Sequence, residues 1–437
     1  MAIEMATESI EQRRSIGICQ ARWPIQVHTA NIALALARSG FDIDLFLYDT
    51  RYLIDMSEIE SNENICVYSF DNIKSSRDIP RGLAKRTFAF LRIHLGRRIK
   101  RLYEFILFKF GDPSSFLPYF IPSYVIDEVD AVVSRTKNYH CLIGIEKTGL
   151  VWAGNLSDKY HMPYVYFSLE LYTKAHSFYK TSFLNKLIKK AEEKYHFRSD
   201  LTIIQDSKRA EVLLRDNGLE EHASVIYLPV SMTGSNHDAK SSFLQDNFYL
   251  EDDQIVILQF GKIDRYGSEL TEVAQYFPHN WQLILHDGIL ATDKQIALIK
   301  KLDANNKVTL SLKRLKNSEN IKQLVASAHI GLVFYPGSNE NDKLTAFSSE
   351  KLALYLQCGV PVVTFDHPGY EVIEKTGCGI SISQLSEIGG AVRKILEKYE
   401  LYCQNARNAF LKYYCFENNV VSVVDAIKSL PSTNVRS

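Results

Sequence analysis

The sequence predicts an α/β protein with two domains, each built on a parallel sheet that helices cover on both faces. Short runs of Val, Ile and Leu alternate with amphipathic helical segments in two separate series. A polar segment rich in Ser and Asn, 231–247, lies between the series and is the best candidate for a linker. The length of 437 residues favours about two or three domains over a single core.

The first series begins with a strand–helix–strand unit, for which we expect a strand at 16–19, a helix at 29–40 and a strand at 41–49. Thr29 suits the N-cap of this helix and Gly40 suits the position after its end. Further strands are expected at 140–145, 162–171, 201–207 and 224–230, with helices at 149–160 and 208–218. We assign 1–230 to a Rossmann-like N-terminal domain.

The second series predicts strands at 254–261, 281–288, 307–312, 329–336 and 360–365, with helices at 268–278, 293–306, 318–328 and 348–359. Two more helices are expected at 386–399 and 400–428. We assign 231–410 to a second Rossmann-like domain. Residues 411–437 form a C-terminal helix, for which packing against the first domain is one option.

The composition argues for a soluble, cytoplasmic protein without global attraction to nucleic acid. The formal net charge is +0, and the seven cysteines are scattered singly, with no C-x-x-C pair. Residues 1–15 lack the apolar core of a signal peptide, and no apolar run has the length of a membrane span. No His/Cys cluster has ligand spacing, and the "DID" of 42–44 enters a strand, so no metal is expected.

Residues 81–110 interrupt the first series with a basic, amphipathic segment. It carries nine basic side chains and one acid: Arg81, Lys85, Arg86, Arg92, Arg97, Arg98, Lys100, Arg101 and Lys109 against Glu104. Such a segment can rest on an anionic membrane surface, on the inner face of the membrane, or hold an anionic acceptor. The alternative is an insertion that packs on the N-terminal domain and leaves its charges solvated.

The stretch "TAFSSEKLALYLQCGVPVV", 345–363, places Ser348, Ser349 and Glu350 at the start of an apolar helix. Asp342 lies upstream, separated from Glu350 by seven residues. A helix start can bind a phosphate through its N–H groups and dipole, and a carboxylate there can accept hydrogen bonds from two ribose hydroxyls. The alternative is ordinary capping by Ser348, with Glu350 stabilised by the helix dipole.

This stretch resembles the C-terminal domain of retaining GT-B glycosyltransferases related to sucrose and glycogen synthases. Their signature is two acidic residues separated by seven, followed by a helix and a Gly-x-Pro-Val-Val strand, here Asp342, Glu350 and "CGVPVV". Asp342 stands where the family usually has Glu. The resemblance covers roughly 255–385 and implies two Rossmann-like domains facing across a cleft, with the base held near "VTLSLKRL".

A second element of the resemblance is "LQFGKIDRYG", 258–267, where Gly261 and Lys262 follow a strand and Arg265 comes three residues later. In the family, Gly allows close backbone approach and basic side chains neutralise the departing diphosphate. Lys262 and Arg265 fit that electrostatic function. A solvated basic turn is the alternative.

The N-terminal half matches the family only in layout, since "ARWPIQVHT" replaces its usual Gly-rich loop. Glu146 and Glu170 follow predicted strands, and Glu146 falls near the place where relatives hold a His or Asp beside the reacting sugar. Both can equally cap a following helix. His28 is a candidate cleft residue, although a lone His is more often structural.

The resemblance implies a metal-independent glycosyltransferase that moves a sugar from a nucleoside diphosphate donor, UDP-sugar before GDP-sugar, to an unidentified acceptor with retention. Its candidate catalytic residues are Glu146, Asp342 and Lys262, and its candidate donor-binding residues are Gly261, Lys262, Arg265, Asp342, Ser348, Ser349 and Glu350. The acceptor can be a glycan, a lipid-linked molecule or a small molecule. A UDP-sugar 2-epimerase on the same fold and a non-catalytic partner of another transferase remain alternatives.

Overall fold

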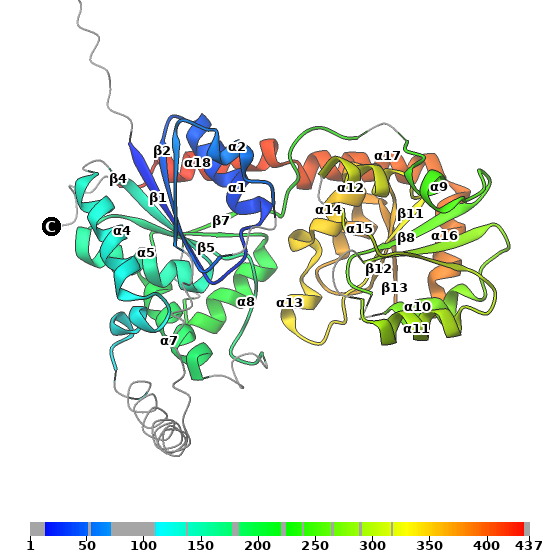
Figure 1. The fold of residues 1–437 in the computed structure, drawn as a ribbon, viewed down its shortest axis with the longest axis horizontal. Helices are drawn as coiled ribbons and strands as arrows, with labels where there is room; N and C mark the ends of the chain where they lie inside the picture. The colour runs from blue at the N-terminus through cyan, green and yellow to red at the C-terminus, as the bar shows by residue number, and fades with distance from the viewer. Residues whose placement is uncertain are drawn as a thin grey trace, which may run out of the picture. The chain divides into compact units, whose positions relative to one another are not determined.

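The structure is a computed structural model that describes residues 14–50, 54–70, 109, 111–136, 139–176, 183–219, 224–237, 240–263, 266–287, 291–315 and 318–431. The basic segment 81–110, Lys109 apart, and Arg265 lie outside these residues. The chain divides into two compact units (Figure 1). Unit 1 contains the described residues up to Ile204, from Leu213 to Ile226 and from Ser422 onward, and unit 2 contains Gln205–Val212 and Tyr227–Val421.

Unit 1 is built on a seven-stranded sheet in the order β3-β2-β1-β4-β5-β6-β7. Its strands are β1 (Ser15–Ala21), β2 (Asp42–Tyr48), β3 (Ile65–Phe70), β4 (Tyr139–Ile145), β5 (Tyr164–Phe167), β6 (Leu201–Ile204) and β7 (Val225–Tyr227). Sequence analysis missed β3, an edge strand with one buried residue, although its apolar run "ICVY" is as long as the run that predicted the first strand.

The helices of this half are α1 (Val27–Arg38), α2 (Ser57–Glu60), α4 (Ser123–Arg135), α5 (Glu146–Tyr160), α7 (Phe183–Phe197) and α8 (Ser207–Asn217), with a 3-10 helix at Pro113–Tyr119. The predicted N-cap at Thr29 is wrong. Helix α1 starts at Val27 with Gln26 as its N-cap, and Thr29 is fully buried within the first turn. Gly40 has φ +95 and lies just beyond the end of α1, as predicted.

Unit 2 is built on a six-stranded sheet in the order β10-β9-β8-β11-β12-β13. Its strands are β8 (Ile255–Phe260), β9 (Trp281–His286), β10 (Val308–Ser311), β11 (Ile330–Val333), β12 (Val362–Phe365) and β13 (Gly379–Ile382). Its helices are α9 (Phe243–Phe248), α10 (Gly267–Ala274), α11 (Asp293–Leu302), α12 (Ser318–Ala326), α13 (Glu340–Lys343), α14 (Glu350–Gln357), α15 (Glu371–Thr376), α16 (Ile388–Glu397) and α17 (Tyr399–Ala409), with 3-10 helices at Ala346–Ser348 and Leu385–Glu387.

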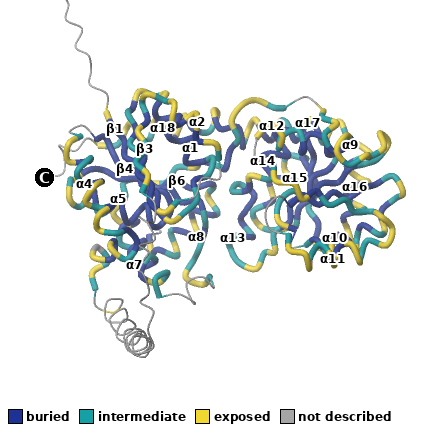
Figure 2. Tube along the Cα trace, in the orientation of Figure 1, coloured by how far each residue is buried: buried dark blue, intermediate teal, exposed yellow. Residues whose placement is uncertain are grey.

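Alternate residues of the unit 2 strands enter two different hydrophobic clusters, one on each face of the sheet. Val256 and Leu258 belong to one cluster, and Ile257 between them belongs to the other. The middle four residues of β8 are accordingly buried, and Figure 2 colours buried stretches of the trace dark blue. The predicted α/β architecture with two parallel sheets is confirmed.

The helix predicted at 400–428 is divided in two. Helix α17 ends at Ala409, a π-helical turn spans Phe410–Tyr414, and α18 spans Phe416–Lys428. At Cys415 the chain leaves the helix to pair with Met232, whose N–H donates to the Tyr414 carbonyl and whose own carbonyl accepts from the Phe416 N–H. This short parallel bridge explains the break, and it also orders part of the predicted linker.

The strand orders fix where each unit can bind a ligand. In unit 1 the chain runs from β1 to one side through β2 and returns on the other side as β4, and in unit 2 the same reversal occurs between β8 and β11. In parallel sheets a crevice opens at the carboxyl ends of the two strands that flank such a reversal. The carboxyl ends of β1 and β4 and those of β8 and β11 are therefore the expected ligand-binding positions.

Candidate functional site

The loop after β8 carries the predicted residues Gly261 and Lys262. Gly261 has φ +107, a conformation that side chains disfavour, and its N–H donates to the His286 carbonyl at 3.0 Å. The N–H of Ile263 donates to the buried Asp287 carboxylate at 3.0 Å. These bonds fix a tight turn at the end of β8 that leaves the Lys262 side chain exposed.

The start of α14 is capped by Ser349, one residue later than the Ser348 cap that sequence analysis weighed. Ser349 Oγ accepts from the Leu352 N–H at 3.2 Å, and it lies 3.0 Å from the Tyr335 hydroxyl. Ser348 instead donates to the Thr345 carbonyl at 3.3 Å. Glu350 is the first residue of α14, and it is exposed at the positive end of the helix dipole.

The Lys351 side chain, at the start of α14, lies close to the loop after β8. A Cβ atom on Gly261 would lie 3.6 Å from Lys351 Cε, and Lys351 Nζ lies 5.2 Å from the centroid of the Tyr335 ring. The hydroxyl of Tyr355, one turn further along α14, donates to the Leu258 carbonyl at 2.7 Å and accepts from the Phe260 N–H at 3.1 Å. These two hydrogen bonds hold α14 against the carboxyl end of β8.

Sequence reasoning missed Lys351 and Tyr355, although both stand in the stretch that it singled out. A basic residue after Glu350 looks like an ordinary exposed helix position. Only the fold shows that its side chain lies against Gly261.

Asp342 is buried in α13, in the loop that follows β11. Its carboxylate accepts from Asn339 Nδ2 at 3.1 Å and from Ser338 Oγ at 3.2 Å, while its N–H donates to Asn339 Oδ1 at 3.0 Å. These bonds hold the loop between β11 and α14 in shape. The structure therefore places Asp342 in a local polar cluster on the approach to the helix that carries Glu350.

In unit 1, Glu146 occupies a strained and buried position at the end of β4. It is the first residue of α5, has φ +58 and is 4 % exposed. Its Oε1 accepts from the N–H groups of Leu169 and Glu170, both at 2.7 Å. The carboxylate therefore does not cap α5 but holds the loop that follows β5.

Burial raises the pKa of Glu146 to about 7, because loss of hydration disfavours the charged carboxylate more than the neighbouring Lys147 ammonium favours it. A carboxyl group with such a pKa exchanges a proton near neutral pH. Close packing makes the burial possible, since a Cβ on Gly149 of α5 would lie 2.2 Å from the Cys19 carbonyl oxygen of β1.

The other N-terminal candidates take different positions. His28 is buried in the first turn of α1, and Glu170 is partly exposed, with its N–H bonded to Glu146. Sequence analysis did not single out Arg22 or Trp23, which follow β1 and line a cavity together with Glu146. An aromatic residue directly after the first strand was the one available signal.

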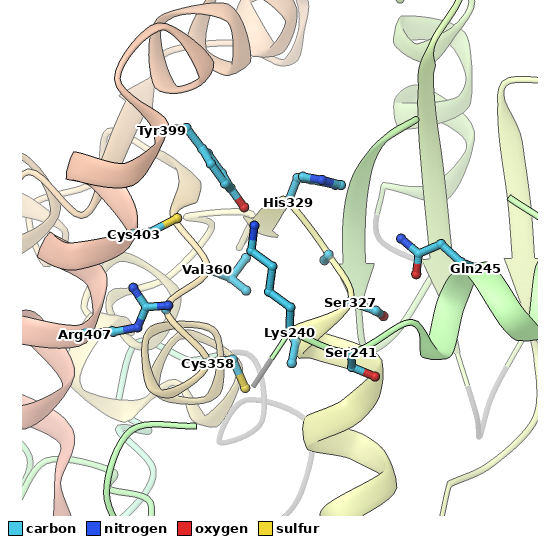
Figure 3. A pocket seen from close by; sticks show the side chains of 13 residues that line it. Lys240, Ser241, Gln245, Ser327, His329, Cys358, Val360, Tyr399, Cys403 and Arg407 are labelled. Atoms are coloured by element: carbon cyan, nitrogen blue, oxygen red, sulfur yellow. The ribbon is translucent and has the colours of Figure 1, made fainter. Parts of the chain in front are cut away.

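A pocket of about 80 Å³ lies at the opposite edge of the unit 2 sheet, where β11 and β12 begin and α12 and α14 end. Figure 3 shows Lys240, His329, Tyr399 and Arg407 around it. A Cβ on Gly359, just after α14, would lie 2.8 Å from Arg407 Cζ. Cations at helix carboxyl ends stabilise the dipoles, so these residues have a structural explanation, and we do not place the functional site here.

Among the described residues no group of three or more His, Cys, Asp or Glu side chains is arranged to hold a metal ion. In the same part of the chain no helix is long and apolar enough to cross a membrane.

Comparisons with known proteins bear on the fold and on part of unit 2. Residues 289–412 match the family model of the glucosyltransferase 3-like C-terminal domain. Sucrose-phosphate synthase from Thermosynechococcus elongatus superposes with a TM-score of 0.65 at 14 % identity, over 96 % of this chain and 99 % of that one. Anabaena HepE, solved in complex with UDP, gives a TM-score of 0.64 at 16 % identity, over 95 % and 100 %.

The chain has the GT-B fold. The predicted resemblance to GT-B glycosyltransferases is confirmed at this level. A structure from Listeria monocytogenes described as a putative UDP-N-acetylglucosamine 2-epimerase also matches, with a TM-score of 0.55 at 11 % identity over 95 % and 96 % of the two chains. No curated protein matches the sequence.

Proposed function

We propose that the protein is a glycosyltransferase that takes a sugar from a nucleoside diphosphate donor, and that the donor binds at the carboxyl ends of β8 and β11 in unit 2. The observation that carries the proposal is the proximity of the β8 loop to the α14 start, where Lys351 Cε lies 3.6 Å from the place that a Cβ atom on Gly261 would take. The match of residues 289–412 to a glucosyltransferase-type domain, which includes α14, supports it.

Each group at this junction has a chemical function in the proposal. The positive end of the α14 dipole attracts the diphosphate, and the ammonium groups of Lys262 and Lys351 offset its charge. The exposed Glu350 carboxylate accepts hydrogen bonds from the two ribose hydroxyls. Asp342 keeps the β11–α14 loop in the shape that presents Glu350.

We propose UDP-sugar as the donor, with GDP-sugar second. HepE was solved with UDP and with UDP-glucose, which supports the uridine base. The reaction proposed breaks the bond between the sugar C1 and the β-phosphate oxygen and forms the bond from the acceptor oxygen to C1 on the same face. The acceptor proton passes to the departing phosphate, so that no protein nucleophile and no metal ion is required.

A thermal-shift series with UDP, GDP and ADP, each with and without EDTA, tests the donor. A nucleotide present at a hundred times its dissociation constant stabilises the folded protein by about 2.7 kcal/mol. We expect the largest shift with UDP and the same shift in EDTA. If none of the three nucleotides changes the melting temperature, the donor site proposed here does not exist.

The second candidate function is a UDP-sugar 2-epimerase, because a structure described as such an enzyme shares the fold. Incubation with UDP-N-acetylglucosamine separates the two functions. A 2-epimer formed without any acceptor would establish the epimerase and overturn transfer. A protein that binds UDP yet turns over no donor with any acceptor would be the non-catalytic partner.

A further inference from the structure

Arg209 of α8 is a buried cation that the proposed donor site does not include. Its side chain is 1 % exposed and is among the largest fully buried side chains of the described residues. Residues Gln205–Val212, which contain the first half of α8, belong to unit 2, as does the loop between β11 and α14. Burial of a guanidinium group is costly unless hydrogen bonds compensate it, so the partners of Arg209 indicate what it does.

The guanidinium group of Arg209 holds the short helix α13 at its carboxyl end. Arg209 Nη1 donates to the carbonyl of Leu344, the C-cap of α13, at 3.3 Å, and Nη2 donates to Asn341 Oδ1 at 3.1 Å. The planar guanidinium thus bridges two groups that lie three residues apart in the chain. Its Nε donates to the buried Gln205 Oε1 at 2.6 Å, which fixes the direction in which the group faces.

Helix α13 needs such support because it has only four residues. An isolated helical turn is unstable, and the carbonyl groups at its end have no partner within the helix. At the amino end of α13, Asn339 Oδ1 accepts from the Asp342 N–H at 3.0 Å. At the carboxyl end, Arg209 supplies donors and a positive charge, which the helix dipole favours. Different side chains therefore hold the two ends of α13, with Asp342 between them.

Hydrogen bonds continue from α13 to the start of α14. The carbonyl of Asn341 accepts from Thr345 Oγ1 at 3.0 Å, and the carbonyl of Thr345 accepts from the Ser348 N–H at 2.9 Å. Ser349, the next residue, caps α14. Arg209 is therefore connected through Asn341 and Thr345 to the helix start at which we place the donor nucleotide.

We propose that Arg209 is a positioning residue for donor binding, which holds the loop between β11 and α14 in the arrangement that binds the diphosphate and the ribose. This inference rests on the proposed function. Arg209 does not touch the donor and acts through Asn341 and the Leu344 carbonyl. A loop that adopts the binding arrangement for only part of the time binds the nucleotide more weakly in proportion.

The alternative is that Arg209 only stabilises α8. Its backbone N–H donates to Asp206 Oδ1 at 2.9 Å, and the Asp206 carboxylate lies close enough to attract the guanidinium charge. A backbone N–H forms this cap with almost any residue type, whereas the bonds to Asn341 and Leu344 need the arginine side chain. The two explanations differ in the effect that a substitution has on the nucleotide affinity of the folded protein.

Calorimetric titration of UDP into full-chain variants tests the proposal. Arg209→Met keeps most of the length of the side chain and removes its charge and donors, and we expect UDP to bind about tenfold more weakly. Arg209→Lys keeps the charge but cannot bridge both oxygen atoms in the same way, and we expect a loss of about threefold. The matched control is Arg215→Met, which changes an exposed arginine of the same helix and should leave UDP affinity unchanged.

A double variant shows whether Arg209 acts through the loop. Asn341→Ala should weaken UDP binding about threefold. The combination of Arg209→Met with Asn341→Ala should bind UDP no more weakly than Arg209→Met alone, because the second change removes a partner that is already lost. A residue that only stabilises the fold would lower the urea midpoint of Arg209→Met without changing the UDP affinity of the folded protein.

Circular dichroism checks the fold of each variant, and Arg209→Lys and Asn341→Ala decide the question if Arg209→Met does not fold. Wild-type UDP affinity in the folded Arg209 variants, independent effects in the double variant, or equal weakening in Arg215→Met would each overturn the inference and leave the donor site standing. If the wild type itself binds no nucleotide, the proposed donor site fails and this inference fails with it.

Discussion

The carboxyl ends of the two sheets are constructed in different ways. At the edge in unit 1, the left-handed residues after β1 and β4 are Arg22 and Glu146, and the Glu146 carboxyl group is buried. At the edge in unit 2, the left-handed residues after β8 and β11 are Gly261 and Gly337, and Lys262 and Glu350 are exposed. Unit 1 holds charged residues in left-handed backbone conformations, which are costly for them. Unit 2 instead has glycines at its left-handed positions and a helix with an ordinary serine cap.

This difference indicates different requirements for the two sites. A diphosphate needs close backbone approach and mobile cations, which glycines and exposed lysines provide. A side chain that must keep one orientation needs burial and backbone constraint, which Glu146 has. Three substitutions measure the difference, from the largest expected effect to the smallest.

The first substitution is Glu146→Gln, which keeps the shape and the two accepted hydrogen bonds but removes the titration. The wild-type pKa of Glu146 is raised from 4.5 to about 7 by burial, so the native state retains a proton that the unfolded chain releases. Wild-type stability should therefore fall, relative to the variant, as pH rises from about 4.5 to about 7, by about 3 kcal/mol in total.

Urea unfolding at a series of pH values measures this difference. Glu128→Gln, on the exposed face of α4, is the matched control and should run parallel to the wild type. If the Glu146→Gln curve also ran parallel to the wild type, the buried carboxyl group would not titrate as described.

The second substitution is Gly261→Ala in unit 2. The nearest atom to the new Cβ is the flexible end of Lys351 at 3.6 Å, so the cost comes from the backbone at φ +107 and not from a clash. We expect destabilisation by about 2 kcal/mol together with weaker nucleotide binding. Gly390→Ala in α16, where a Cβ meets nothing within 4 Å, is the control and should stabilise by about 0.5 to 1 kcal/mol.

The third substitution is Arg22→Gly in unit 1. Glycine relieves the strain at φ +58 but adds freedom to the unfolded chain, so the two effects nearly cancel. We expect the free energy of unfolding to change by less than about 1 kcal/mol. Urea unfolding of the variant and the wild type checks this, and a loss of more than about 2 kcal/mol would show that the two effects do not cancel.

Much of unit 2 is predictable from sequence because its signals are local. Continuous apolar strands, glycines at turns and the spacing of Asp342 and Glu350 each act over a few residues. The proximity of Lys351 to Gly261 could not be predicted, since it brings together segments about ninety residues apart and depends on how α14 crosses the sheet. The break at Cys415 likewise depends on a distant partner, Met232.

The site residues of unit 1 were harder to predict from the sequence, for a physical reason. A left-handed Arg22 or Glu146 has no sequence signature, because such a conformation runs against the preference of the residue and is imposed by its surroundings. The Glu146 carboxylate is held by the N–H groups of Leu169 and Glu170, and any residue type could supply those. Sequence showed that a carboxylate follows β4, but it could not show its burial or its partners.

The central claim is that the α14 start binds the donor nucleotide, and calorimetric titration of UDP into Glu350→Ala tests it most directly. The control is Glu400→Ala, which removes an exposed first-turn glutamate of α17, a helix that follows α16 and not a strand. Loss of the hydrogen bonds to ribose should weaken UDP binding by about 10- to 100-fold in Glu350→Ala and leave it unchanged in Glu400→Ala. Equal UDP affinity in the wild type and both variants would contradict the account.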